Sequence, residues 1–337
     1  MMNIYDDYLK RIKSAIAADE QTEILSKSID GIEGRALEES FRNFTGEAHE
    51  EKLLPSIQDL AQELGVELNF DQQLGLHPDF AHLKDSDRAE KHYIVSMFVD
   101  IKGSTNLFKK YTPETVYIIN STIQQAAIHT YLIFGGYIHR LQGDGLFIYY
   151  GGKELSEKEA VHRALRGASV FSYFVKFDLQ NLFDAQGIEK IYIRTGIDLG
   201  YERDVIWAKA GIGEISEVTT CSLHTSLASK MQSSANSNGI VIGDYVKDNA
   251  EAYHNFLSPV CHRTEKDQDR YIFEIPEKKF RYTQYDFHWL PFLKKQDFIA
   301  TDLNGNLRLK RKVTNTTPRI LKNMAPIAER NKPYFGF

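Results

Sequence analysis

The sequence predicts an α+β protein in which helices pack on a mixed or antiparallel β-sheet. Residues 93–99 form a strongly apolar run, typical of a buried strand. Residues 137–150 predict two strands joined by a Gly-Asp-Gly turn, which is a hairpin signal. Helical patterns over 113–133 and 156–177 precede and follow this hairpin. The resulting order of strand, helix, hairpin, helix and strand is typical of an α+β fold.

The first ninety residues predict a helical segment followed by a connector. Apolar residues between Ile4 and Ile16 recur every three to five positions, which places them on one face of a helix. A second short helix is expected over 56–64, after Pro55. The polar stretch 69–90 contains Pro78 and predicts a connector. We therefore expect a first segment over residues 1–90.

The central elements each carry a local signal. Thr112 and Pro113 predict the start of the long helix, because Thr is a favoured N-cap and Pro fits the first helical turn. The glycine pair at 135–136 ends that helix. Further along the chain we expect strands at 191–199, 239–242 and 271–275 and a helix over 219–233. These elements predict a central domain over residues 91–276.

Residues 277–337 form a predicted C-terminal extension, first aromatic-rich and then basic. The aromatic residues between Tyr285 and Leu293 are expected to pack against the rest of the protein. From Gly305 to Phe337 the chain has eight Lys or Arg residues and one Glu. A solvated tail and a basic arm that touches a neighbouring subunit or an anionic ligand both fit this pattern.

Composition excludes several classes of protein. Hydrophobic residues make up 42% and charged residues 26% of the chain, which excludes a disordered or fibrous protein. We expect no membrane span, since no apolar run approaches about 20 residues. Without a signal-like N-terminus, and with only Cys221 and Cys261, a cytoplasmic location is expected. The net charge of −5 argues against nucleic-acid binding.

Two aspartates are the strongest chemical signal. Asp100 follows the first buried strand and Asp144 lies in the hairpin turn. If these elements are neighbours, both carboxylates point into one cleft, where they repel each other unless a cation lies between them. Mg²⁺ or Mn²⁺ with phosphate oxygens as further ligands fits such a site. Separately, each motif also fits an ordinary hairpin turn or a helix cap.

The residues after Asp100 add a second feature. Backbone N–H groups of Gly103, Ser104 and Thr105 can turn inward and form a nest for phosphate oxygens.

These motifs resemble those of class III nucleotidyl cyclases. The segment 98–107 (FVDIKGSTNL) resembles the first metal motif, and 135–147 (GGYIHRLQGDGLF) resembles the second. Segments 193–200 and 225–231 resemble the following strand and the late helix. The resemblance covers about residues 92–275. It implies a ferredoxin-like cyclase domain that works as a head-to-tail homodimer with two shared active sites.

The resemblance also implies roles for individual residues. Two divalent ions, Mn²⁺ or Mg²⁺, would be held by Asp100, Asp144 and the carbonyl of Ile101. The triphosphate would lie against residues 103–105. In the late helix, Ser226 stands where the family has Asn and Lys230 where it has Arg. These two would contact the ribose and the transferring phosphorus, although Lys lacks the two-pronged geometry of Arg.

The positions that read the base depart from the adenylyl cyclase pattern. Arg140 replaces a Lys and Thr219 replaces an Asp. Because Arg only donates hydrogen bonds, it favours a base with carbonyl oxygens, uracil or guanine. Tyr93 either fills the space of a purine or is an ordinary aromatic at a strand edge. Together these residues predict UTP as substrate in preference to CTP.

This departure is similar to the pyrimidine cyclases of bacterial Pycsar anti-phage systems. That resemblance implies formation of cyclic UMP or cyclic CMP during infection, with an effector reached through the cyclic nucleotide rather than by direct contact. The substitutions at Ser226 and Lys230 leave an alternative, a non-catalytic cyclase-like module that binds a nucleotide. An adenylyl or guanylyl cyclase with an altered pocket is the third possibility.

Overall fold

The computed structural model describes residues 4–28, 35–47, 52–68, 70–303 and 305–310. Most of the basic tail, residues 311–337, lies outside the described residues. The helices are α1 (Asp6–Ser28), α2 (Arg35–Glu47), α3 (Pro55–Leu64), α4 (Pro113–Ile133), α5 (Glu157–Tyr173), α6 (Gln180–Ala185), α7 (Leu223–Ser234), α8 (Asp244–Asn249), α9 (Cys261–Thr264) and α10 (Trp289–Lys294). Among the described residues, no helix has both the length and the apolar character that a membrane span needs.

The described strands form one large sheet and two small ones. The strands are β1 (Ala89–Lys91), β2 (Ile94–Lys102), β3 (Tyr137–Gln142), β4 (Gly145–Tyr150), β5 (Tyr192–Gly200), β6 (Val205–Ile212), β7 (Ile215–Ser222), β8 (Gly239–Gly243), β9 (Leu257–Pro259), β10 (Tyr271–Ile275), β11 (Phe280–Phe287), β12 (Ile299–Thr301) and β13 (Leu307–Leu309). The large sheet has the order β10-β11-β8-β5-β2-β4-β3, with β9 beside β11.

The centre of the large sheet has the ferredoxin-like order. In chain order its units are β2, α4, β3, β4, α5 and β5, and in space the strands run β5-β2-β4-β3 with antiparallel neighbours. β8 then adds parallel to β5, and β11 antiparallel to β8. The α+β, ferredoxin-like prediction is therefore confirmed. The predicted domain limits stay a prediction, and the sheet continues past residue 276 through β11.

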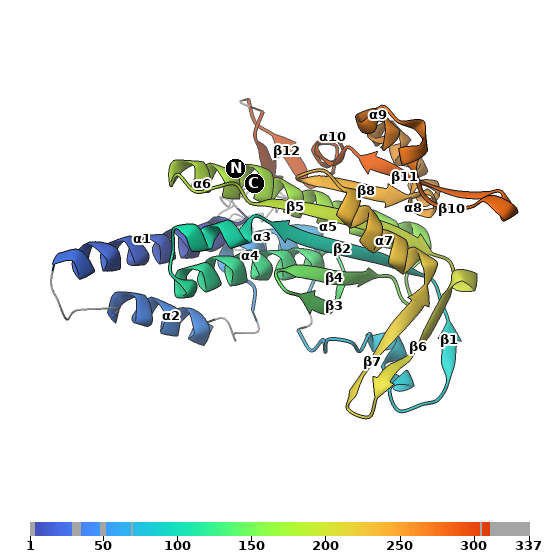
Figure 1. Ribbon diagram of the computed structural model, residues 1–337, viewed down its shortest axis with the longest axis horizontal. Helices are drawn as coiled ribbons and strands as arrows, with labels where there is room; N and C mark the ends of the chain where they lie inside the picture. The colour runs from blue at the N-terminus through green and yellow to red at the C-terminus, as the bar shows by residue number, and fades with distance from the viewer. Residues whose placement is uncertain (1–3, 29–34, 48–51, 69, 304, 311–337) are drawn as a thin grey trace, which may run out of the picture.

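Helices cover both faces of this sheet (Figure 1). On β2, alternate residues such as Val95, Met97 and Val99 are buried in the core shared with α4 and α5. The residues between them, such as Ser96, point to the other face of the sheet, toward α7. The Ser96 hydroxyl lies 2.9 Å from that of Thr225 on this helix. α7 packs closely because Gly196 has no side chain: a Cβ there would lie 2.1 Å from the Ala228 carbonyl oxygen. Asp100 is four residues after Ser96 on β2 and so lies on the same face of the sheet, toward α7.

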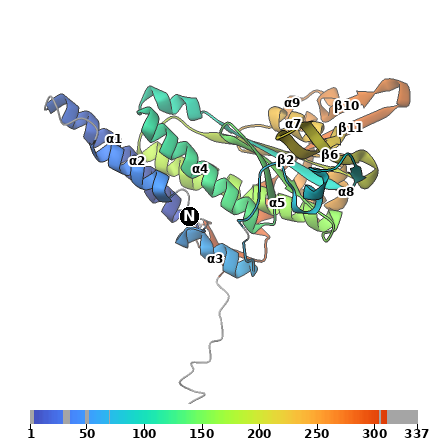
Figure 2. The ribbon, with the colours of Figure 1, turned by 90° about the horizontal axis from the view of Figure 1, so that it is seen from below.

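The N-terminal helices pack beside α4 (Figure 2). The predicted stripe is confirmed, since Ile4, Leu9, Ile12 and Ile16 are all buried. The N-cap prediction for α4 is also confirmed, because the Thr112 side chain accepts a hydrogen bond from the Thr115 backbone N–H. A π-helical turn over Phe174–Leu179 interrupts the predicted helix 156–177.

One element differs from the prediction. Residues 219–222, expected to begin a helix, end strand β7, and α7 begins at Leu223. β6 and β7 form a hairpin that projects from the large sheet and pairs with β1 (Figure 1). The aromatic segment 285–293 ends β11 and enters α10, where Trp289 and Phe292 are buried as predicted.

Candidate functional site

The strand register brings the turn of Asp144 beside Asp100. Val99 pairs with Leu146 across β2 and β4, so the hairpin turn lies level with Asp100 and Ile101. The approach is close, because a Cβ on Gly145 would lie 2.6 Å from the Val99 carbonyl oxygen and 3.5 Å from the Asp100 Cα. No side chain fits at Gly145, so this position requires glycine. The backbone segments that carry Asp100 and Asp144 are therefore adjacent.

Each carboxylate has defined partners. Asp144 Oδ2 accepts a hydrogen bond from the Ser104 hydroxyl at 2.5 Å. Asp100 Oδ2 accepts from Arg194 Nη2 at 2.6 Å and from Gln232 Nε2 at 3.3 Å. Arg194 and Gln232 were not predicted. Arg194 stands opposite Asp100 in the pairing of β2 with β5, a relation that only the register reveals.

The loop after Asp100 has a fixed shape. Gly103 has φ +92°, and a Cβ there would lie 2.8 Å from the Lys190 carbonyl oxygen, so the position requires glycine. Ser104 and Thr105 begin the short 3₁₀ helix Ser104–Lys109. Ser104 is buried, and its hydroxyl joins this loop to Asp144. The loop and the hairpin turn therefore form one unit.

The donor set suits a hard divalent cation. Asp100, Asp144 and the Ile101 carbonyl offer oxygen ligands, which Mg²⁺ and Mn²⁺ prefer. The close packing of Gly145 against Val99 and Asp100 shows that the backbone on either side of this donor set lies close together. Among the described residues, no group of three or more His, Cys, Asp or Glu side chains is placed to hold a metal ion, so the candidate site consists of two carboxylates and a backbone carbonyl.

The predicted base residues fall into two places. Arg140 and Thr219 lie together: Arg140 Nε donates to Glu217 Oε2 at 2.6 Å, and Thr219 is two residues further along β7. Tyr93 precedes β2, at the end of the strand away from Asp100. It is buried, and its hydroxyl donates to the Leu155 carbonyl oxygen. The structure therefore does not bring Tyr93 together with Arg140 and Thr219.

His139 links the base residues to the core of the sheet. Its Nε2 lies 3.1 Å from the Thr219 hydroxyl, and the ring is fully buried. Burial and the neighbouring Arg140 charge lower the pKa of His139 to about 3, so the imidazole is uncharged at neutral pH. It therefore brings no positive charge to this group.

Ser226 and Lys230 lie one helical turn apart on the exposed face of α7. The Ser226 hydroxyl donates to the Ser222 carbonyl oxygen at 3.3 Å, and Lys230 Nζ lies 6.0 Å from the centre of the Phe273 ring. Gln232, on the buried side of the same helix, contacts Asp100. The two predicted catalytic residues thus face outward, whereas the metal residues lie beneath the end of the helix.

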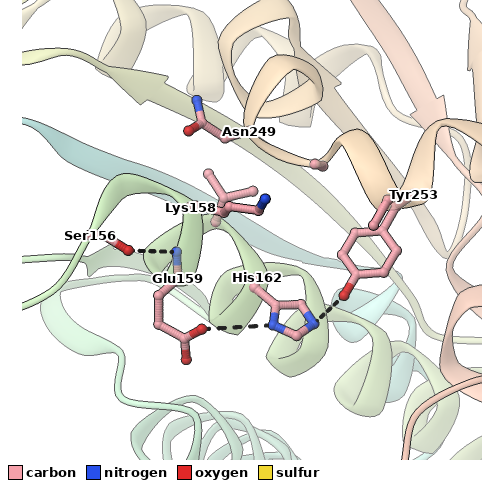
Figure 3. A pocket seen from close by; sticks show the side chains of 9 residues that line it. Ser156, Lys158, Glu159, His162, Asn249 and Tyr253 are labelled. Atoms are coloured by element: carbon pink, nitrogen blue, oxygen red, sulfur yellow. Dashed lines mark hydrogen bonds and ion pairs between the residues drawn. The ribbon is translucent and has the colours of Figure 1, made fainter.

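A separate cavity of about 220 Å³ lies between α5 and α8 (Figure 3). There His162 Nε2 lies 2.6 Å from the Tyr253 hydroxyl. None of the predicted site residues, all of which lie in the described part of the chain, lines this cavity.

Comparison with known proteins finds sequence relatives of one kind. No family model matches the chain. A cytidylate cyclase from Staphylococcus aureus is 35% identical over 266 residues, which cover 75% of this chain and 62% of that protein. A cytidylate cyclase from Escherichia coli is 32% identical over 226 residues, covering 63% of this chain and 47% of that protein. The chain thus spans roughly half to three fifths of these relatives.

Solved structures of nucleotidyl cyclases are also similar. The adenylyl cyclase CyaB from P. aeruginosa has 19% identity and a TM-score of 0.48, covering 59% of this chain and 95% of that one. The guanylate cyclase domain of RhGC from Catenaria anguillulae has 17% identity and a TM-score of 0.45, and the match covers 59% of this chain and 97% of that one.

Proposed function

We propose that this chain, which resembles class III nucleotidyl cyclases and has cytidylate cyclases among its sequence relatives, converts a pyrimidine nucleoside triphosphate into its 3′,5′-cyclic monophosphate and pyrophosphate. The observation that carries the proposal is the pairing of β2 with β4, which sets the Asp144 turn beside Asp100. The preference for UTP that Arg140 predicts is not supported by the relatives, which are named cytidylate cyclase. We therefore propose CTP as the preferred substrate.

In this proposal Asp100, Asp144 and the Ile101 carbonyl would hold two divalent ions, Mn²⁺ or Mg²⁺. Such ions neutralise phosphate charge and make a hydroxyl more acidic. The backbone N–H groups of residues 103–105 bind phosphate oxygens. The 3′-oxygen bonds to the α-phosphorus in line as the bond from that phosphorus to the bridging oxygen of the β-phosphate breaks, the hydroxyl proton passes to solvent, and pyrophosphate leaves. The protein contributes positioning and electrostatic stabilisation.

The remaining residues act around the nucleotide. Lys230 offsets the charge that develops on the phosphorus, and Ser226 hydrogen-bonds the ribose. Arg140 and Thr219 lie at the base, whereas Tyr93 is buried, bonds to the Leu155 carbonyl oxygen and takes no part in the base site of this proposal. Arg194 joins this set because it contacts Asp100 and is positioned to meet a triphosphate bound there.

The proposal includes a head-to-tail homodimer with two shared sites. The outward orientation of Ser226 and Lys230 supports it, because an exposed helix face is available to a second copy. A cytoplasmic role in anti-phage defence, with the cyclic nucleotide activating a separate effector, completes the proposal.

A second candidate is a non-catalytic module that binds a nucleotide. The ion pair between Asp100 and Arg194 favours it, since a carboxylate neutralised by the protein itself has less need of a metal. Ser226 and Lys230, in place of the Asn and Arg typical of the resembling family, favour it as well.

One experiment tests both candidates. Purified protein is incubated with Mn²⁺ and each of ATP, CTP, GTP and UTP, and the products are identified by mass spectrometry, with Asp100→Asn as the control. Cyclic CMP from the wild type and none from the control is the expected result. Absence of any cyclic product, together with measurable nucleotide binding, would favour the non-catalytic module.

A further inference from the structure

A β-bulge turns two consecutive residues of β3 toward β7. The pairing of β3 with β4 shifts between Ile138 and Arg140, and such a bulge re-aims side chains. His139 consequently contacts Thr219 and Arg140 contacts Glu217. Glu217 and Thr219 are two residues apart on β7 and lie on the same face of that strand.

Arg140 and Glu217 form a two-point ion pair. Arg140 Nε donates to Glu217 Oε2 at 2.6 Å, and Nη2 meets Oε1. The Arg140 side chain is 41% exposed and that of Glu217 is 24% exposed. Arg has five N–H donors, so the pair leaves further donors on Arg140, and a carboxylate oxygen has more than one acceptor site. The pair thus presents a donor and an acceptor side by side.

Thr219 is less suited to accept a hydrogen bond from a base. Its hydroxyl lies 3.1 Å from His139 Nε2 and 3.4 Å from the Tyr149 hydroxyl, so its bonding capacity is engaged within the protein. Glu217, by contrast, is paired through both carboxylate oxygens with Arg140, and each oxygen keeps a second acceptor site.

We infer that Glu217 is the residue that accepts a hydrogen bond from the exocyclic amino group of cytosine, with Arg140 donating to the neighbouring ring acceptor. The inference rests on the proposed function, because it concerns the base of the same nucleotide. Cytosine presents an amino donor next to ring acceptors, which matches the pair. Uracil presents a carbonyl oxygen at that place, and a carboxylate cannot donate to it. The pair therefore selects CTP over UTP.

The backbone of Gly75 holds this pair in place. The Gly75 N–H donates to the His139 carbonyl oxygen at 2.9 Å, and its own carbonyl accepts from the Val218 N–H at 2.7 Å. Its φ is +71°, and a Cβ on Gly75 would lie 2.7 Å from the Glu217 Cβ. Glu217 is thus pressed between Gly75 and Arg140, which reduces the reorganisation needed when a base binds.

The test is the ratio of kcat/KM for CTP to kcat/KM for UTP in Glu217→Gln. The amide of Gln can donate as well as accept a hydrogen bond. The uracil carbonyl oxygen of UTP therefore gains a donor, and the cytosine amino group of CTP loses a charged acceptor. We expect the ratio to fall about tenfold or more, the effect of one hydrogen bond to a charged group. Glu217→Asp keeps the carboxylate and should retain the preference at a lower rate. Glu214→Gln makes the same charge change at an exposed position of the same hairpin and should leave the ratio unchanged.

Equilibrium binding of CTP and UTP with Ca²⁺ in place of Mn²⁺ separates the two proposals. One outcome is that the wild type forms no cyclic product but binds CTP more tightly than UTP, and that Glu217→Gln loses this difference in affinity. The cyclase proposal then fails and the role of Glu217 stands. A Glu217→Gln protein with an unchanged ratio overturns the role of Glu217 and leaves the cyclase proposal intact. A wild type that forms cyclic product but prefers UTP overturns both the role of Glu217 and the proposed preference for CTP, and leaves the cyclase activity intact. If neither nucleotide binds, both are overturned.

Discussion

The guanidinium of Arg194 pairs with the carboxylate of Asp100, with Nη2 at 2.6 Å from Oδ2. Its other terminal nitrogen, Nη1, donates to the Ser233 carbonyl oxygen at 2.9 Å. One side chain of β5 thus joins the end of β2 to the last turn of α7. Arg194 is largely buried, with 16% of its side chain exposed, whereas 35% of the Asp100 side chain is exposed. The pair therefore joins a buried arginine to a carboxylate that solvent still reaches.

Replacing Arg194 by Met should reduce activity strongly. The substitution leaves Asp100 without its counter-charge and removes a cation beside the proposed triphosphate site. We expect kcat/KM to fall by about 100-fold, the scale of one charged stabilising group. Steady-state kinetics should be compared with those of Arg203→Met, which removes an arginine that is 72% exposed and paired with Asp204. Equal activity in the two variants would contradict the proposed role of Arg194 in the site.

Mixing two inactive subunits should restore activity if the sites are shared. Asp100→Ala removes a proposed metal ligand, and Lys230→Ala removes the proposed phosphate contact on α7. In a head-to-tail dimer that combines the two variants, one site carries both defects and the other none. An equal mixture should therefore regain about a quarter of wild-type activity, since half the dimers are mixed. If mass spectrometry shows mixed dimers but no product forms, the sites are not shared in this way.

Gly196→Ala should displace α7. The added Cβ would lie 2.1 Å from the Ala228 carbonyl oxygen and 2.2 Å from the Gln232 backbone nitrogen, so the helix has to move. Overpacking of this kind costs about 1–3 kcal/mol of unfolding free energy. We expect a lower urea midpoint together with lower activity. Gly46→Ala, where no heavy atom lies within 4 Å of the added Cβ, is the matched control. Because Gly46 lies in α2 and Ala favours a helix, this control should keep wild-type activity with a urea midpoint equal to or slightly above that of the wild type.

Asp178 should make stability depend on pH. Burial raises the pKa of Asp178 from 3.8 to about 7, and the residue is 2% exposed. Because the folded pKa exceeds the unfolded one, the unfolding free energy should fall as pH rises from about 4 to about 7, by up to about 4 kcal/mol. Asp178→Asn should therefore be more stable than wild type at about pH 8, with a smaller advantage at about pH 5. Urea unfolding at both pH values measures this, and an advantage that does not grow with pH would contradict the assignment.

The ferredoxin-like core was predictable because its signals are local. The apolar run of β2, the Gly-Asp-Gly turn and the Thr-Pro start of α4 each determine a nearby backbone shape. The β6–β7 hairpin was missed although Gly213, in the turn between its strands, carries a hairpin signal. Residues 219–222 were consequently expected to be helical. β7 ends directly at the Ser222 N-cap of α7, so no loop separates the two elements.

The aspartates of the site were predictable, and their partners were not. Arg194 reaches Asp100, and Glu217 reaches Arg140, only through the register of strands far apart in the sequence. The preference for UTP followed from treating Arg140 as a free donor. Its pairing with Glu217 places an acceptor at the same point, and a single sequence shows no sign of that contact.

The two hydrogen bonds of Gly75 also cover the exposed edges of two strands, β3 and β7. β3 is the outermost strand of the large sheet and β7 the outermost strand of the small one, and each would otherwise present unpaired backbone groups there. Gly75 occupies a place on both edges at once, bonding to His139 on β3 and to Val218 on β7. A chain shortened to begin after residue 77 would leave both edges open, and open strand edges are where β-proteins aggregate.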